Sequence, residues 1–124
     1  MSEELRGVVV CHGPMAEALV RAAEQISGVE AALIPVSNTG CDRNTLEQRV
    51  LAAVDGRPAV VFVDLSSGSC LFAVLKRLKS EESVRVVTGV NLAMLVDFVF
   101  HRSISPAEAA SRAVSTGQAS IRIP

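Results

Sequence analysis

Short apolar runs alternate with longer stretches in which apolar residues recur every three or four positions. The run of valines at 8–10 is apolar on both faces, which is typical of a central parallel strand. Similar runs predict further strands at 31–36, 59–63 and 84–88. Gly13-Pro14 ends the first run and opens the stretch that follows it.

The stretches between the strands predict helices. The first spans 14–27, the second begins near Asp42 and ends at Gly56, and the third follows the loop at 65–69. A fourth begins after Asn91, and the capping box Ser105-Pro-Ala-Glu108 starts a fifth. The residues expected to face the sheet include Met15, Leu19, Ala22 and Ile26 in the first helix, Leu71, Leu75 and Leu78 in the third, and Leu92, Leu95, Val96 and Val99 in the fourth.

The last residues alternate apolar Ala119, Ile121 and Ile123 with polar residues, which predicts a half-exposed edge strand. Repeated strand-helix units predict an α/β fold with a parallel sheet and helices on both faces. We expect a three-layer, doubly wound arrangement with strand order 2-1-3-4. In this order the first and third strands are neighbours where the winding reverses.

Two polar residues directly follow these central strands. His12 comes after the run at 8–10, and Asp64 comes after the run at 59–63. Neighbouring strands lie about 4.8 Å apart, so the two side chains are expected to touch. The carboxylate would accept the Nδ1–H of the imidazole and leave Nε2 unprotonated, which makes Nε2 a nucleophile. The pair therefore suits a phosphoryl group on His12.

The turn Ser66-Ser67-Gly68-Ser69 opens the third helix at the same edge and offers N–H groups and hydroxyls to an anion. Each of these features also has a structural interpretation. A histidine after a strand is often a loop residue, and Asp64 alone could be a turn residue. Serine and glycine before a helix are common capping residues. The joint placement of His12 and Asp64 favours the functional interpretation.

The composition limits the class of protein. The 124 residues, 49% of them apolar, suit one domain over 1–124. A formal net charge of -1 argues against nucleic-acid binding. No apolar run approaches the roughly 20 residues of a membrane span, and the acidic start is unlike a signal peptide, so a cytoplasmic location is expected. Cys11, Cys41 and Cys70 lack CxxC spacing, which favours reduced thiols, although a metal or thiol site with His12 stays open.

Three stretches together resemble the enzyme IIA component of the mannose/sorbose class of the bacterial phosphoenolpyruvate-dependent sugar phosphotransferase system. They are Gly-Val-Val-Val-Cys-His-Gly at 7–13, Val63-Asp64 with Gly68-Ser69 shortly after, and Thr-Gly-Val-Asn-Leu-Ala-Met-Leu-Val-Asp at 88–97. The resemblance implies four parallel strands and a C-terminal antiparallel strand that is exchanged between the subunits of a homodimer.

The resemblance also implies an activity. Members accept a phosphoryl group on a histidine from the phosphocarrier HPr and pass it to an enzyme IIB, and they contact the membrane permease only indirectly. His12 matches the phosphorylated histidine, Asp64 its orienting aspartate and Ser69 the small polar residue beside the phosphoryl group. We expect Gly13, Ser67 and Gly68 to complete the phosphoryl-binding loop. No metal or organic cofactor is expected.

The sequence departs from the family pattern at three points. Cys11 precedes the histidine where threonine is common, and Ser67-Gly68-Ser69-Cys70 stands where the family has Gly-Gly-Ser-Pro or Gly-Gly-Thr-Pro. The final segment is also short for an exchanged strand. Two alternatives stay open: a regulatory module whose phosphorylation on His12 is read by a partner, and a flavodoxin-like cofactor binder. The absence of Trp and Tyr disfavours the second.

Overall fold

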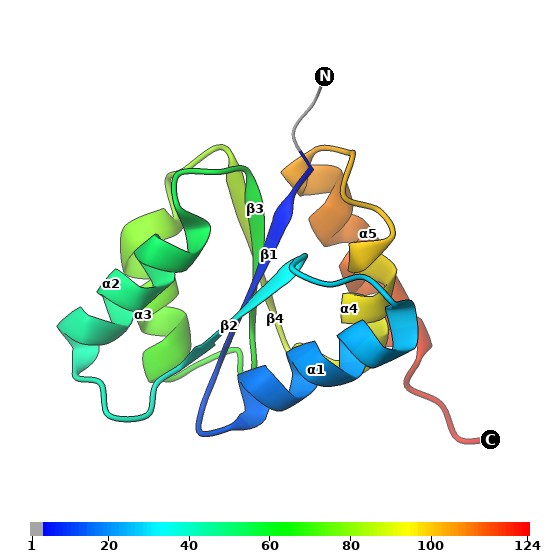
Figure 1. The fold of residues 1–124 in the computed structure, drawn as a ribbon, viewed down its shortest axis with the longest axis horizontal. Helices are drawn as coiled ribbons and strands as arrows, with labels where there is room; N and C mark the ends of the chain where they lie inside the picture. Colours follow the sequence, from blue (N-terminus) through cyan, green and yellow to red (C-terminus); the bar gives the residue numbers. More distant parts are fainter. Residues whose placement is uncertain (1–3) are drawn as a thin grey trace.

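The computed structural model describes residues 4–124 and contains four strands and five helices in that range (Figure 1). Strands and helices alternate as far as the fourth helix, and a fifth helix follows it directly. The elements are β1 (Arg6–Cys11), α1 (Met15–Ser27), β2 (Leu33–Ser37), α2 (Arg43–Val54), β3 (Ala59–Val63), α3 (Ser69–Leu78), β4 (Val84–Thr88), α4 (Leu92–Val99) and α5 (Pro106–Ala119). None of the helices in the described range is long and apolar enough to cross a membrane.

The four strands form one parallel sheet in the order β2-β1-β3-β4, which confirms the predicted fold class and strand order. The valines at 8–10 are fully buried because β1 has a strand on each side and helices on both faces. Val10 pairs with Val63 in the register, so β1 and β3 end side by side. His12 directly follows β1 and Asp64 directly follows β3, so both predicted site residues lie at the carboxyl edge of the sheet.

Helices cover both faces of the sheet (Figure 1), and an apolar core lies on each face. Alternate residues of each central strand point to opposite faces, so Val9 and Phe62 pack with α1, α4 and α5, whereas Val8 and Val61 pack with α2 and α3. The predicted three-layer arrangement is therefore confirmed.

A buried carboxylate joins the two helices on one of these faces. Glu47 of α2 is 1% exposed, and its Oε1 accepts from Arg77 Nε of α3 at 2.7 Å. Lys76 Nζ lies 3.6 Å from the other carboxylate oxygen. The hydrogen bond from Arg77 lowers the pKa of Glu47 despite burial, so the carboxylate stays charged and paired. This ion pair holds α3 against α2.

The predicted helix starts are confirmed where a side chain caps the helix. Asp42, Asn91 and Ser105 are the N-caps of α2, α4 and α5, and each accepts a backbone N–H from the first turn. The starts of α1 and α3 have no side-chain cap.

The predicted inward face of α1 is wrong by one stripe, and that of α3 is confirmed for Leu78 and wrong for Leu71 and Leu75, which are only partly buried. Met15 and Ile26 are exposed, and the buried residues of α1 are Ala16, Val20 and Ala23. In α3, Cys70, Ala73 and Val74 are buried with Leu78, while Leu71 is only partly buried. Small residues let each helix approach the sheet closely, so the alanine-containing stripe faces inward and the bulkier stripe beside it lies at the margin.

The predicted C-terminal edge strand does not form within this chain. Helix α5 continues to Ala119, which removes the first residue of the apolar alternation from any strand. Residues 121–124 have no regular structure, and Ile121 and Ile123 are 77% and 100% exposed. Two isoleucines are too few to hold an edge strand on their own sheet.

Candidate functional site

His12 lies one residue beyond β1, at the carboxyl edge of the sheet. Gly13 follows with φ +61°, a left-handed conformation that favours glycine and turns the chain toward α1. The His12 side chain is 41% exposed, so the ring is partly open to solvent.

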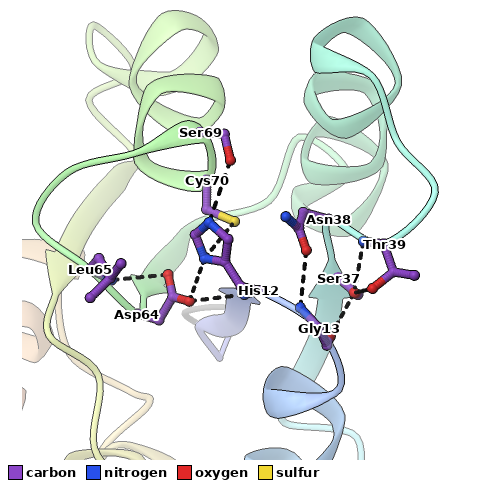
Figure 2. A network of polar contacts seen from close by, with 9 residues as sticks. All are labelled: His12, Gly13, Ser37, Asn38, Thr39, Asp64, Leu65, Ser69 and Cys70. Atoms are coloured by element: carbon purple, nitrogen blue, oxygen red, sulfur yellow. Dashed lines mark hydrogen bonds and ion pairs between the residues drawn. The ribbon is translucent and has the colours of Figure 1, made fainter.

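Asp64 lies one residue beyond β3 and binds His12 twice (Figure 2). Its Oδ2 accepts the backbone N–H of His12 at 2.9 Å and lies 2.7 Å from the ring Nδ1. Its Oδ1 accepts the N–H of Leu65 at 2.9 Å. The side chain is 7% exposed. Burial alone would raise the pKa of Asp64, but the hydrogen bonds from His12 and Leu65 and the charge of His12 lower it overall, so the carboxylate is ionised.

An ionised carboxylate has no hydrogen to donate, so Nδ1 carries the proton in the bond to Asp64. When the ring is neutral, its lone pair is therefore on Nε2. The predicted contact between His12 and Asp64 is thus present, in the geometry that leaves Nε2 a nucleophile.

The start of α3 lies against the Nε2 side of the ring (Figure 2). Ser69 Oγ is 3.5 Å from Nε2, and a Cβ added at Gly68 would lie 4.0 Å from the ring Cε1. Gly68 has φ +96°, which a residue with a side chain rarely adopts. Within the described range, the backbone N–H groups of residues 69–71 donate to no acceptor. These free donors and the helix dipole suit an anion on Nε2.

Two further residues border the site from β2, and the sequence analysis did not identify them. Ser37 Oγ donates to the carbonyl oxygen of Gly13 at 2.7 Å, and Asn38 Oδ1 accepts the N–H of Gly13 at 3.0 Å (Figure 2). A signal was available, because Asn38 directly follows β2 as His12 follows β1 and Asp64 follows β3.

The remaining predicted site residues differ in their surroundings. Gly13 lies beside the ring, but its N–H is engaged by Asn38, so direct binding of a phosphoryl group by Gly13 stays a prediction. Ser67 is exposed in the loop before α3, and its predicted role also stays a prediction.

The three cysteines are unpaired, and Cys70 is the one that approaches His12. Its Sγ lies 3.7 Å from Nδ1, and the ligand atoms of His12, Asp64 and Cys70 lie within 4.8 Å of one another. Two ligands about 2.0 Å from a tetrahedral zinc are roughly 3.3 Å apart. The 2.7 Å between Nδ1 and Oδ2 is a hydrogen-bond distance instead. Burial, with the charge of Asp64, raises the pKa of Cys70 to about 11, so the thiol is protonated. The spacing fits a hydrogen-bonded pair better than a metal centre.

Exposed apolar side chains flank the site. Leu65 and Phe72, on either side of the loop that carries Gly68, are 55% and 50% exposed. The guanidinium of Arg43, at the start of α2, lies 4.4 Å above the Phe72 ring. An exposed histidine with apolar and cationic neighbours suits contact with another protein.

Comparison with protein families gives one match over most of the chain. The model of the EIIA-man family, described as "PTS system fructose IIA component", matches residues 7–115. This range includes every predicted site residue. A search of curated proteins gives no match.

Solved structures of phosphotransferase-system proteins share the fold. The mannose/sorbose-specific IIA subunit from Enterococcus faecalis is 22% identical with a TM-score of 0.86, covering 98% of this chain and 96% of that one. The EIIA component from Streptococcus agalactiae is 18% identical with a TM-score of 0.85, covering 96% of each chain. The IIA protein associated with the fucose utilization operon of Streptococcus pneumoniae is 22% identical with a TM-score of 0.77, covering 98% of this chain and 96% of that one.

Proposed function

The chain belongs to the EIIA-man family of phosphotransferase-system IIA components, and on this basis we propose that it carries a phosphoryl group on His12. The group would come from phospho-HPr and pass to an enzyme IIB during sugar uptake. The single observation that carries the proposal is the 2.7 Å contact between His12 Nδ1 and Asp64 Oδ2, which leaves Nε2 outside that bond in a side chain that is 41% exposed.

In the proposed reaction the Nε2 lone pair attacks the phosphorus of phospho-HPr. The new N–P bond forms as the bond between phosphorus and HPr breaks, and that electron pair stays on HPr. Asp64 stabilises the positive charge that the ring gains, and it holds Nε2 in line with the incoming phosphorus. The free N–H groups at the start of α3 and the Ser69 hydroxyl stabilise the negative phosphoryl oxygens. Transfer to the enzyme IIB reverses these steps on a new acceptor.

The proposed partners are proteins, and the surroundings of His12 support this. Leu65 and Phe72, one before and one after the Gly68-Ser69 segment that borders the ring, expose apolar area to solvent. Burying such area supplies roughly 25 cal/mol per Å² before the cost of association. HPr and the enzyme IIB would use this surface in turn, in the cytoplasm.

Phosphorylation can be tested with HPr, enzyme I and phosphoenolpyruvate. We expect an acid-labile phosphoryl group on the wild-type chain and none on His12→Ala. His101→Ala is the matched control, because the chain has two histidines and the second lies beyond α4. Labelling of His12→Ala at the wild-type level, or loss of label from His101→Ala alone, would contradict the proposal.

We also propose a homodimer, with the segment after α5 placed on the partner subunit. Ile121 and Ile123 are exposed in the single chain, and burying them on a second subunit would offset the cost of ordering this segment. Sedimentation of the full chain beside a chain stopped after Ser120, which leaves α5 intact, is the measurement. The full chain is expected to be a dimer at micromolar concentration and the shortened chain mostly a monomer. A monomeric full chain excludes the dimer, and equal dimers exclude the role of the segment.

A further inference from the structure

We propose that Asn38 is a phosphoryl-binding residue, whose side-chain Nδ2 group donates a hydrogen bond to a phosphoryl oxygen on His12. This inference rests on the proposed phosphorylation of His12 and adds a ligand on the side of the ring opposite Asp64.

The register of the sheet places Asn38 beside His12. Cys11 pairs with Ser37, so the residues one step beyond the two strands, His12 and Asn38, are neighbours at the sheet edge. On the other side of β1, Val10 pairs with Val63, which brings Asp64 alongside. Three consecutive strands of the sheet therefore end in an amide, an imidazole and a carboxylate.

The orientation of the Asn38 amide is determined by its hydrogen bond. Gly13 N–H lies 3.0 Å from Oδ1, and only the oxygen of the amide can accept this bond. The Nδ2 group must then occupy the other position. In Figure 2 the nitrogen lies on the side of the amide nearer the imidazole, across the gap from Asp64.

The amide is also held in place by its backbone. The N–H of Asn38 donates to the carbonyl oxygen of Cys11 at 3.3 Å. Ser37 Oγ donates to the carbonyl oxygen of Gly13, and Arg49 Nη1 lies 3.3 Å from the carbonyl oxygen of Ser37. These bonds tie the end of β2 to β1, to the turn that follows His12 and to α2, so Nδ2 is positioned before any ligand binds.

The Nδ2 group of this half-buried residue donates to no acceptor in residues 4–124. A phosphoryl group on Nε2 brings three oxygens, and Asp64 adds a further negative charge beside the ring. Ser69 and the start of α3 supply donors on one side of that group. Asn38 supplies a neutral donor on the β2 side that has no acceptor within residues 4–124.

The substitution Asn38→Asp isolates Nδ2. Aspartate keeps an oxygen for Gly13 N–H and replaces the donor by a charged acceptor of almost the same shape. We expect the equilibrium of phosphoryl exchange to shift by roughly ten- to a hundredfold toward phospho-HPr and the unphosphorylated chain. This is the usual effect of losing a hydrogen bond to a charged group. Asn38→Ala, which adds no charge, should shift the equilibrium in the same direction by less.

Asn44→Asp is the matched control, because it makes the same change of charge at an exposed position on α2. It should leave the exchange equilibrium at the wild-type value. Thermal melting and the ¹⁵N signals of unphosphorylated His12, with the proton on Nδ1, should be the same in Asn38→Asp as in the wild type. These two measurements show whether the turn that follows His12 is intact in the variant.

The outcomes separate the two proposals. An equilibrium for Asn38→Asp equal to that of Asn44→Asp would overturn the role of Asn38 and leave phosphorylation of His12 standing. A shift in Asn38→Asp that comes with a changed His12 tautomer would also overturn it, since the residue would then act through the turn. A wild-type chain that takes no phosphoryl group would remove both proposals.

Discussion

The helices that follow the central strands begin differently from the helices that follow the outer strands. After β2 and β4, Asp42 and Asn91 cap the next helix, accepting the N–H groups of Thr45 at 2.8 Å and Met94 at 3.0 Å. After β1 and β3, the helices begin without a side-chain cap. The uncapped starts are the two that lie next to His12.

The difference shows how one sheet edge serves both stability and binding. A side-chain cap satisfies a backbone donor within the helix and contributes about 1 kcal/mol. At α3 that stabilisation is absent, and the residue in the cap position is Gly68, whose backbone conformation leaves room beside the ring. Donors left free by the missing cap are available to an anion.

The largest expected effect comes from the carboxylate beside His12. Asp64→Asn should slow phosphorylation of His12 in a single-turnover assay by a factor of ten or more, because positioned acid-base groups supply roughly 10²–10⁴. The asparagine side chain can still accept the Nδ1–H of His12, but it carries no negative charge beside the ring.

Asp42→Asn makes the same change at the cap of α2 and should leave the rate unchanged, since asparagine is an equally good N-cap. Equal rates for Asp64→Asn and the wild type would show that both aspartates are structural, and the contrast between the two kinds of strand end would fail.

Ser69→Ala should have the next largest effect, about tenfold on the rate. It removes one donor near Nε2 and leaves the backbone N–H groups of α3 in place. Ser80→Ala, in the turn that follows the other end of α3, serves as the control. If the two variants transfer phosphate equally fast, the backbone alone forms the anion site and the hydroxyl is incidental.

Asn91→Ala should affect stability and leave phosphoryl transfer unchanged. The side chain caps α4, and its Nδ2 donates to the carbonyl oxygen of Gly117 in α5 at 3.1 Å. Losing both bonds should cost about 1–2 kcal/mol and lower the melting temperature by several degrees. Asn91→Asp keeps the cap and should recover part of this loss. A folded Asn91→Ala protein with slow transfer would contradict the division of roles.

The smallest effect is expected from the thiols. Burial is the main reason that the pKa of Cys11 is raised to about 12 and that of Cys70 to about 11, so at pH 8 iodoacetamide should modify Cys41 first. Replacing all three by alanine should preserve phosphoryl transfer, and the purified protein should contain no stoichiometric zinc. Loss of transfer in a folded variant, or one metal per chain by elemental analysis, would revive the metal alternative.

The strand order and three helix starts could be predicted because each depends on a strong local signal. The valines at 8–10 mark a strand buried on both faces, and Asp42, Asn91 and Ser105 each precede a helical apolar pattern. The contact between His12 and Asp64 follows from the strand order, since strands that end side by side bring the next residues together.

The helix faces and the role of Asn38 could not be read from the same signals. In α1, the stripe with Met15 and the stripe with Ala16 have the same helical spacing, and contact with the sheet decides between them. Asn38 resembles any polar residue after a strand until its bond to Gly13 is seen. The predicted C-terminal edge strand was wrong for a related reason. Ala119 has the spacing of a strand residue in the alternating sequence, but it also has high helix propensity, and it forms the last residue of α5.

The double bond of Asp64 to His12 also affects the conformational entropy of the site. One oxygen binds both the backbone N–H and the ring nitrogen of the same residue, so the χ1 and χ2 torsions of His12 are restrained together. A free histidine would have to lose this rotational freedom, a cost of up to about 1–2 kcal/mol, in every transfer event. Here the torsions are already restricted when the chain folds, so each encounter with a phosphorylated partner meets a ring that is already aligned.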